Sequence, residues 1–305
     1  MASPERPAVD PADSLAIDVR GLTKAYGHVR AVQGVDLQVR AGEIFALLGP
    51  NGAGKTTTVE ILEGYRPRDG GTAKVLGYDP GRQRQRLKSR IGIVLQSSGV
   101  DRYLTVAETI AMYSSYYPNP QPVDEVIGLV GLGEKRDARV IKLSGGQQRR
   151  LDVAIGIVGR PELLFLDEPT AGFDPEARRD FHDVVHRLTD REKTTILLTT
   201  HDLDEAERLA DRILILAGGT IIADGSADEL GRAMSGQSEV RWSRDGQRFV
   251  RAADDATAFV RELFRQYGES VEDLEVHRAS LEDTYMALVR QAEHGVPRRL
   301  TAVAA

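Results

Sequence analysis

Residues 44–57 read IFALLGPNGAGKTT, and this stretch decides the fold. The apolar run Ile44–Leu48 ends at a glycine and a proline, a pattern that indicates a buried strand. From Thr56 onward the sequence TTTVEIL favours a helix. The predicted order is therefore strand, glycine-rich loop and helix, which is the context that a phosphate-binding loop requires.

The residues of this loop are suited to holding phosphate groups. Gly49, Gly52 and Gly54 allow the backbone to fold closely around an anion, so that its N–H groups point at phosphate oxygens. Lys55 adds a positive charge, and the Thr56 hydroxyl is a suitable ligand for Mg²⁺. The alternative, an ordinary glycine turn beside an exposed lysine, leaves the flanking strand and helix unexplained. The sequence therefore predicts a nucleotide-binding site.

The composition is typical of a globular protein. The chain has 305 residues, of which 41% are hydrophobic and 28% are charged, enough for one large domain or for a core domain with a small appendage. No apolar run approaches the roughly 20 residues of a membrane helix, and the start MASPERPAVDPADS lacks the apolar centre of a signal peptide. We therefore expect a cytoplasmic protein, and the absence of cysteine agrees with this expectation.

The charge distribution argues against nucleic acid as a partner. The formal net charge is -6, which disfavours broad binding to phosphate backbones. The most basic run, RQRQRLKSR at Arg82–Arg90, is predicted to be the solvated face of a short helix. A local nucleic-acid patch is the weaker interpretation of this run because no aromatic residues are interleaved with the charges.

The segment before the loop is predicted to form strands. Residues 1–14 are rich in proline, alanine and charge, and we expect a disordered lead there. Leu15–Val19 reads as a first strand, the following LTKAYG puts Tyr26 in a loop, and Val32–Glu43 supplies a further short strand pair. Tyr26 could stack on an adenine ring or could be an ordinary surface tyrosine, and the residues alone leave both open.

Polar residues follow three predicted strands where each strand ends. Gln96 follows Ile91–Leu95, Asp167 and Glu168 follow Leu163–Leu166, and His201 follows Thr194–Thr200. Ligands of an open α/β sheet bind at the carboxyl ends of its strands, so these side chains are expected at one edge.

Each of these polar residues suggests a role at a phosphate site. Asp167 is placed to hold Mg²⁺, directly or through water, and Glu168 to orient or deprotonate an attacking water. His201 is placed to contact a γ-phosphate. Taken singly, an acidic pair after a strand is usually a helix cap or a solvated turn, and a histidine at a strand end is usually structural. Their shared edge with Lys55 favours the functional interpretation.

A helical insertion is predicted between about residues 97 and 159. It ends in LSGGQQRRLDVAIGIVG at Leu143–Gly159, where Ser144 is a suitable N-cap for a largely buried helix. This is a second glycine-containing helix start that can hold an anion, but no lysine accompanies it.

The remainder of the chain is predicted to complete the core and add a small domain. Ile213–Leu216, Gly218–Gly219 and Thr220–Ile222 form a hairpin pattern. Residues 236–292 suggest a small α+β accessory domain with Phe259, Leu263 and Phe264 on one helical face, and residues 293–305 a loose tail. The predicted fold class is α/β, a P-loop NTPase core over residues 15–235 with an antiparallel β subdomain and a helical insertion, followed by the accessory domain.

The motifs together resemble those of an ATP-binding cassette ATPase, over about Leu15–Leu230. GPNGAGKT resembles the family's Walker A motif, Gln96 its Q-loop glutamine, LSGGQ its signature motif, LLFLDE its Walker B motif with the catalytic glutamate, and AGFDP its D-loop. His201 resembles the switch histidine and Tyr26 the adenine-stacking aromatic. Phe173 departs from the leucine that is usual in the D-loop, but Asp174 is kept.

The resemblance implies an active ATPase that uses ATP and Mg²⁺. It implies catalytic roles for Glu168, His201 and Gln96, and a metal site formed by Thr56, Gln96 and Asp167. The nucleotide-binding residues that it implies are Tyr26, Gly49, Pro50, Asn51, Gly52, Ala53, Gly54, Lys55, Thr56, Thr57, Ser144, Gly145, Gly146, Gln147 and Asp174.

Within the family, two stretches are similar to drug and antibiotic exporters of the daunorubicin-resistance type. These are EILEGYRP at Glu60–Pro67 and LEVHRASLEDTYMAL at Leu274–Leu288. The likeness implies a peripheral subunit on the cytoplasmic face of the cell membrane, working with a separate permease that carries the contacts to the exported drug, antibiotic or lipid-like molecule.

The resemblance also names a partner for the second helix start. It implies a second copy of the chain, packed head to tail, so that each ATP lies between the Walker A motif of one copy and the signature motif of the other. The alternative is a cassette ATPase that acts on the ribosome or on DNA. A single Walker A motif, a single LSGGQ, no cysteine and no sustained heptads disfavour that alternative.

Overall fold

The fold is described from a computed structural model. The chain divides into two compact units, Met1–Ile221 and Ile222–Ala305, and this division lies earlier in the chain than the expected limit of the core at residue 235. The predicted lead at residues 1–13 and Gln96 lie outside the described residues. The structure describes residues 14–95, 99–234, 238–244, 246–253 and 255–278, together with 282, 285, 300 and 301.

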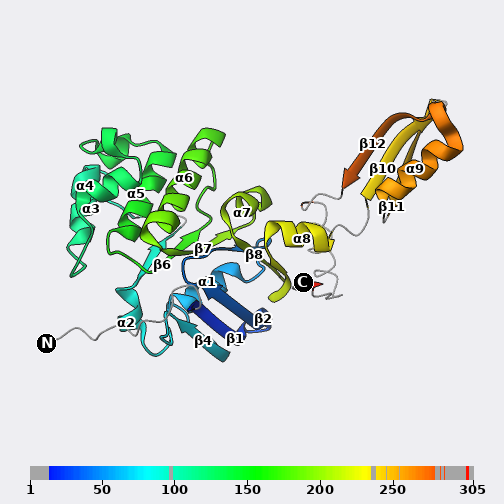
Figure 1. The fold of residues 1–305 in the computed structure, drawn as a ribbon. Helices are drawn as coiled ribbons and strands as arrows, with labels where there is room; N and C mark the ends of the chain where they lie inside the picture. Colours follow the sequence, from blue (N-terminus) through cyan, green and yellow to red (C-terminus); the bar gives the residue numbers. More distant parts are fainter. Residues whose placement is uncertain are drawn as a thin grey trace. The chain divides into compact units, whose positions relative to one another are not determined.

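A parallel sheet forms the centre of the first unit (Figure 1). Its strands run in the order β8-β3-β7-β6-β5, and each neighbouring pair is parallel. Every residue of β3 and β7 is buried, which explains their continuous apolar and β-branched sequences. The carboxyl ends of β3, β6 and β7 therefore lie side by side. The bounds are β3 (Ile44–Leu48), β5 (Ile91–Val94), β6 (Leu163–Asp167), β7 (Thr195–Thr200) and β8 (Arg212–Ala217).

Helices follow the strands of this sheet. The glycine loop leads from β3 into α1, and the residues after β6 and β7 lead into α6 and α7. Buried apolar side chains at Phe181, Val184, Val185 and Leu188 confirm the predicted core face of α6. The bounds are α1 (Lys55–Leu62), α2 (Arg84–Lys88), α6 (Pro175–Glu192) and α7 (Leu203–Leu209).

An antiparallel sheet of order β2-β1-β4 accompanies the parallel sheet, and it differs from the sequence prediction in two ways. The strand predicted to end at Val19 is β1 (Leu15–Tyr26), so the prediction that Tyr26 lies in a loop is wrong. The predicted strand pair is one strand, β2 (Val29–Arg40). Register shifts and glycines with positive φ, Gly21 at 59° and Gly34 at 76°, allow both long strands to bend without ending. The third strand is β4 (Gly70–Val75).

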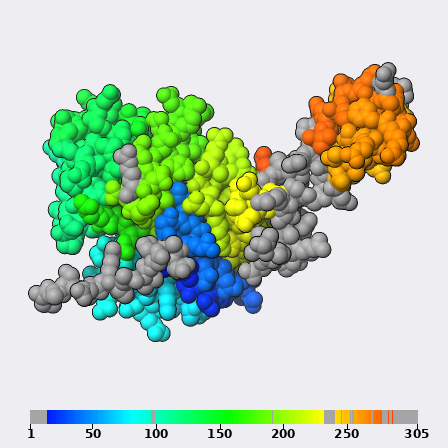
Figure 2. Space-filling model, viewed as in Figure 1, coloured from blue at the N-terminus to red at the C-terminus, as the bar shows by residue number. Residues whose placement is uncertain are grey.

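The predicted helical insertion forms a lobe of the first unit. Figure 2 shows it in green, beside the blue and cyan residues of the antiparallel sheet. The helix α3 begins with a capping box in which Thr105 and Glu108 each accept a hydrogen bond from the other's backbone N–H. The elements are α3 (Val106–Ser114), α4 (Val123–Leu129), η2 (Gly133–Lys135), η3 (Val140–Lys142) and α5 (Gly145–Ile157).

Gly218 and Gly219, both with positive φ, form the predicted turn after β8 and lead into β9 (Thr220–Gly225).

In the second unit, an antiparallel sheet of order β11-β10-β12 packs against α9, with the Trp242 ring stacked on Phe249 and close to Phe259. Phe264 was expected on the same helical face but is exposed, since α9 turns it away from buried Leu263. The other bounds are α8 (Ala227–Met234), β10 (Ser238–Arg244), β11 (Gln247–Ala253), α9 (Ala256–Tyr267), η4 (Gly268–Ser270), β12 (Glu272–Arg278) and β13 (Leu300–Thr301).

Candidate active site

The glycine loop between β3 and α1 is folded tightly against neighbouring strands. A Cβ atom on Gly49 would lie 2.2 Å from the carbonyl oxygen of Leu216, and one on Gly54 would lie 2.2 Å from that of Ala31. Gly54 also has a φ of 102°, a conformation that side-chain-bearing residues rarely adopt. Glycine is therefore required at both positions for the loop to take this shape.

The start of α1 is built to bind an anion. Its N-cap is Gly54, which has no side chain to accept hydrogen bonds from the first-turn N–H groups. Asn51, Gly52 and Thr56 are exposed around this helix end, so a ligand can approach it from solvent. The positive end of the helix dipole adds to the attraction for phosphate.

Lys55 lies buried within the loop, with 6% of its surface exposed. Its Nζ donates hydrogen bonds to the carbonyl oxygens of Gly49 at 2.6 Å and Pro50 at 3.2 Å. Burial lowers the pKa of Lys55, and the negative charges of Glu168 and Asp167 oppose that change. The ammonium group is therefore held at the loop, close to both acidic residues.

Thr199 of β7 orients both acidic residues that follow β6. The register places Thr199 opposite Asp167, and its hydroxyl donates to Asp167 Oδ1 at 2.5 Å. The backbone N–H of Glu168 in turn donates to the Thr199 carbonyl at 3.1 Å and to its hydroxyl oxygen at 3.2 Å. The sequence prediction missed Thr199, and the only signal for it was a threonine near the end of a predicted neighbouring strand.

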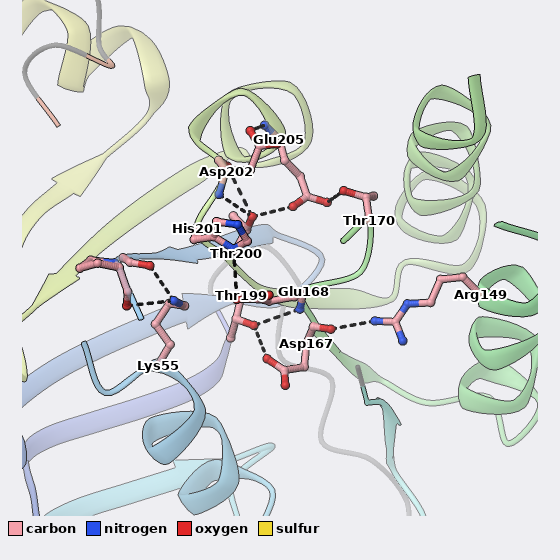
Figure 3. A network of polar contacts seen from close by, with 12 residues as sticks. Lys55, Arg149, Asp167, Glu168, Thr170, Thr199, Thr200, His201, Asp202 and Glu205 are labelled. Carbon is pink, nitrogen blue, oxygen red and sulfur yellow. Dashed lines mark hydrogen bonds and ion pairs between the residues drawn. The ribbon is translucent and has the colours of Figure 1, made fainter. Parts of the chain in front are cut away.

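Glu168 and His201 meet at the carboxyl edge of the sheet, as predicted (Figure 3). Glu168 Oε1 lies 3.2 Å from His201 Nδ1. Glu168 also has a φ of 42°, an unfavourable value for a residue with a side chain, and such strain is concentrated at functional sites. The His201 side chain is 55% exposed and that of Glu168 is 18% exposed, so a ligand can reach the pair from the His201 side.

Arg149 connects α5 to the ends of two strands, and the sequence prediction missed it. Its guanidinium donates to the carbonyl oxygen of Asp167 at 2.7 Å (Figure 3). It also donates to the carbonyl oxygen of Pro169 at 3.0 Å and to that of Leu95. Burial lowers the pKa of Arg149, while Asp152, Asp167 and Glu205 raise it. A buried arginine that binds three backbone carbonyls fixes the position of α5 relative to the residues on either side of Glu168.

A second buried network supports the segment that carries His201. Glu205 accepts hydrogen bonds from the hydroxyls of Thr170 at 2.7 Å and Thr200 at 2.6 Å. Burial raises the pKa of Glu205, and the two hydroxyl donors counteract this. Asp202 accepts from the Glu205 N–H at 3.2 Å as the N-cap of α7 and forms an ion pair with Arg178 at 2.8 Å. The backbone on both sides of His201 is thus held by hydrogen bonds.

The predicted second helix start, at α5, differs from that of α1. Ser144 is its N-cap, and Ser144 and Gln147 form a capping box in which each side chain accepts from the other's backbone N–H, at 3.3 Å and 3.0 Å. Ser144 and Gly145 are exposed. Asp174, the predicted D-loop residue, is the N-cap of α6 and accepts from the N–H groups of Glu176 and Ala177.

Tyr26 contacts cations at the end of β1. The Arg66 guanidinium lies 5.2 Å from the ring centroid and Lys24 Nζ lies 5.7 Å from it, and 40% of the Tyr26 surface is exposed. An adenine stack on this ring remains a prediction, as do the roles of the other loop residues and of Gln96.

Known proteins are similar to this chain in sequence. A family model described as "ABC transporter" matches residues 32–171. The chain is 45% identical over 220 residues to the daunorubicin/doxorubicin resistance ATP-binding protein DrrA of Streptomyces peucetius, a match that covers 70% of this chain and 66% of that protein, just under two thirds. It is 41% identical over 221 residues to the Nod factor export ATP-binding protein I of Rhizobium sp. (strain N33), which covers 71% of this chain and 72% of that protein.

A solved structure has a similar fold over most of this chain. It is the dimeric post-hydrolysis state of the ATP-binding cassette MJ0796 bound to ADP and Pi, with a TM-score of 0.61 and 22% identity over 69% of this chain and 98% of that chain. At this identity the likeness is one of fold.

Proposed function

The chain belongs to the family of ABC transporter ATP-binding proteins, and from this premise we propose that it binds and hydrolyses ATP to drive export through a separate membrane protein. One observation carries the proposal: Lys55, Asp167, Glu168 and His201 converge at the carboxyl edge of one parallel sheet, beside an uncapped helix start. That combination provides a binding site for a triphosphate. It also places a carboxylate within reach of the terminal phosphate.

The loop residues bind the triphosphate in this proposal. Lys55 exchanges its hydrogen bonds to Gly49 and Pro50 for bonds to phosphate oxygens, which keeps the ammonium group paired in both states. The Asp167 carboxylate, the Thr56 hydroxyl and the Gln96 side chain are oxygen donors of the kind that Mg²⁺ prefers, and they would hold it. Bound Mg²⁺ supplies neutralisation of phosphate charge.

Glu168 and His201 act on the terminal phosphate. Glu168 orients the attacking water and accepts its proton, and the Thr199 backbone and hydroxyl hold the glutamate for this task. His201 donates a hydrogen bond to the phosphate, since its exposed ring lies beside the glutamate.

A second copy of the chain completes the site in a head-to-tail dimer. Ser144, Gly145, Gly146 and Gln147 would contribute N–H groups and a hydroxyl to the phosphate held by the other copy's loop, with Asp174 close to the contact. The exposure of Ser144 and Gly145 supports this arrangement, as does the dimeric state of the related cassette bound to ADP and Pi.

Export needs a path across the membrane. In the part of the chain that the structure describes, no helix has both the length and the apolar character needed to cross a bilayer. The relatives are named as resistance and export ATP-binding proteins. In this proposal the chain is a peripheral subunit on the cytoplasmic face of the membrane, bound to a permease that carries a drug, an antibiotic or a lipid-like molecule, in line with the relatives' names.

Substitution Glu168→Gln tests the hydrolytic role. Because the amide cannot accept a proton, steady-state phosphate release should fall at least ~100-fold, and ATP should then leave a dimer detectable by sedimentation. Glu125→Gln, an exposed change on α4, is the matched control and should keep the wild-type rate. Wild-type turnover in the Glu168→Gln protein would remove the glutamate from this role.

Purification of the protein from detergent-solubilised membranes tests the partner. It should bring down a membrane protein, whereas co-purification of ribosomes or DNA would favour the rival function.

A further inference from the structure

The most basic run of the chain, Arg82–Arg90, forms a region of positive charge on the surface of the first unit. The run has five basic residues and no acidic one. Its centre is the short helix α2, in which only Leu87 is buried (Figure 1). Arg86 and Lys88, on either side of Leu87, are both exposed. The proposed ATPase site uses none of these residues, so the charge has no role there.

The acidic residues near this run are already neutralised. Asp79 lies 4.0 Å from Arg82, but both of its carboxylate oxygens accept hydrogen bonds from Arg68, at 2.9 Å and 2.7 Å. Glu162 likewise pairs with Arg90 at 2.6 Å. The basic side chains of the run that form no ion pair with any described residue are Arg84, Arg86 and Lys88. The run therefore has an excess of positive charge, although the whole chain has a net charge of -6.

A groove of about 480 Å³ next to α2 brings tyrosine side chains close to these cations. Lys88 lines the groove together with Tyr65 and Tyr116, which are 59% and 73% exposed. The Arg84 guanidinium lies 4.5 Å from the Tyr65 ring centroid, so cations and aromatic rings belong to one surface. We call this surface the α2 patch, and it consists of Tyr65, Arg82, Arg84, Arg86, Lys88 and Tyr116.

Glu63 is the one carboxyl group among the described residues that line the groove, and it adds little negative charge. The residue is buried, and burial first, followed by the charges of Asp167 and Glu60, raises its pKa to about 8. At neutral pH most of this carboxyl group is therefore protonated. The groove leaves the positive charge of α2 without an opposing charge.

We propose that the α2 patch binds the anionic headgroups of a phospholipid bilayer. Clustered lysine and arginine side chains are attracted to anionic lipid surfaces. Tyrosine is enriched at the membrane–water interface, where its ring meets apolar groups and its hydroxyl meets water. The proposal deepens the proposed function, on which it rests for the peripheral location, because it gives the subunit a direct contact with lipid beside its permease.

The arrangement of the cations favours a broad anionic surface over a single acidic protein segment. Among the four cations of the α2 patch, only Lys88 lines the groove. Arg82 and Arg86 are exposed outside it. A segment inserted into the groove would therefore reach one charge, whereas a layer of headgroups can reach all of them.

The expected strength is that of an auxiliary contact. Each lysine or arginine near an anionic bilayer increases the partition constant about fivefold, so four cations give a constant on the order of 10³ M⁻¹. A single myristoyl chain, at ~10⁴ M⁻¹, gives only reversible attachment. The α2 patch therefore orients the subunit at the membrane and leaves the permease as its anchor.

Sedimentation of the full chain with lipid vesicles tests the proposal. The vesicles consist of dioleoylphosphatidylcholine, alone or with about 30% dioleoylphosphatidylglycerol, at low salt. The wild-type protein should bind the anionic vesicles, and Arg86→Gln combined with Lys88→Gln should weaken this binding about 25-fold. Arg30→Gln combined with Arg40→Gln removes the same charge from exposed positions on β2 and should leave binding within about twofold of the wild type.

The substitution Tyr116→Ser separates the aromatic contribution from the electrostatic one. It should weaken binding about threefold and leave the dependence of binding on salt unchanged. The double substitution on α2 should instead reduce that dependence, because it removes the charges that salt screens.

A fluorescent label locates the contact, since the chain has no cysteine of its own. Bimane on Gln85→Cys in α2 should shift its emission to shorter wavelength with the anionic vesicles. Bimane on Glu207→Cys, an exposed position of α7 that lies away from α2 in Figure 1, should not shift.

Two results would overturn the proposal and leave an acidic protein surface as the partner of the α2 patch. One is equal binding to neutral and anionic vesicles, and the other is an equal loss of binding in the two double variants. These measurements contain neither ATP nor the permease. Their outcome is therefore separate from that of the hydrolysis and co-purification experiments.

Discussion

The two helix starts at α1 and α5 use the same backbone donors in opposite ways. At α1 the N-cap is a glycine without side-chain acceptors, and a buried lysine lies beside the free N–H groups. At α5 Ser144 and Gln147 satisfy each other's N–H groups, and no lysine follows. Both ends have the positive helix dipole. The difference lies in what satisfies the donors before a ligand arrives.

This difference explains why one end can bind nucleotide alone and the other needs a partner. The α1 end keeps its donors and its charge for phosphate, so a single chain can hold the triphosphate. The α5 end is stable when empty because it caps itself, and it adds only weak attraction for an anion. Such an end contributes when a second molecule presents a phosphate already held elsewhere.

Removing Lys55 should have the largest effect, because it weakens nucleotide binding at the start of α1. Lys55→Ala removes a buried charge that would bind phosphate oxygens, and ATP affinity should fall about a hundredfold by fluorescence or calorimetric titration. Lys74→Ala, an exposed change on β4, should keep the wild-type affinity. Unchanged ATP affinity in the Lys55→Ala protein would show that the helix end alone holds the nucleotide.

Arg149 ties α5 to the residues on either side of Glu168, and weakening it should affect turnover more than binding. Arg149→Lys keeps the charge but cannot reach three carbonyls, so kcat should fall roughly tenfold with KM for ATP near the wild-type value. Arg150→Lys is the neighbouring control. A rise in KM with unchanged kcat would instead make Arg149 part of nucleotide binding.

A methyl group at Gly145 should weaken the α5 end without disturbing the monomer. A Cβ there would meet no atom within 4 Å, so Gly145→Ala should leave thermal stability unchanged or slightly higher. The methyl group would obstruct close approach of a phosphate from the second copy, and the ATP-dependent dimer should weaken about fivefold by sedimentation. Gly128→Ala on α4, also in open space, is the matched control. A dimer of wild-type strength would remove the α5 start from the interface.

Glu63, at the C-terminal end of α1, should make the free energy of unfolding depend on pH. Burial, followed by the charges of Asp167 and Glu60, raises the pKa of Glu63 from its ordinary 4.5 to about 8. The folded state therefore holds a proton that the unfolded state releases. The stability that this proton contributes is fully present below pH 4.5 and is lost as pH rises through about 8.

The substitution Glu63→Gln should remove this loss of stability with rising pH. In the nucleotide-free protein, its Tm should exceed that of the wild type by roughly 5 °C at alkaline pH, corresponding to about 2 kcal/mol, and the difference should shrink toward pH 5. A difference that is constant with pH would mean that Glu63 does not titrate in this range.

Local spacing was enough to predict the loop and the polar residues at the strand ends. Lys55 directly follows the glycines of the loop. Asp167, Glu168 and His201 each come after a run of apolar or β-branched residues that indicates a buried strand. The predictions failed at β1, expected to end at Val19, and at β2, expected to be a short strand pair, since these strands continue past Gly21 and Gly34. There the paired strands tolerate a bulge, because the ladder resumes beyond it.

The sequence by itself determined the order of the motifs, the chemistry of the phosphate loop and the self-capping of α5, since all of these depend on residues a few positions apart. Only the tertiary structure decided that Thr199 orients Asp167 and Glu168, that Arg149 binds the ends of two strands, and that Tyr65 and Tyr116 share a groove with α2. Hydrogen bonds act over about 3 Å and in set directions. Which distant residues come that close follows from the register and packing of the whole sheet, and no short stretch of sequence contains that information.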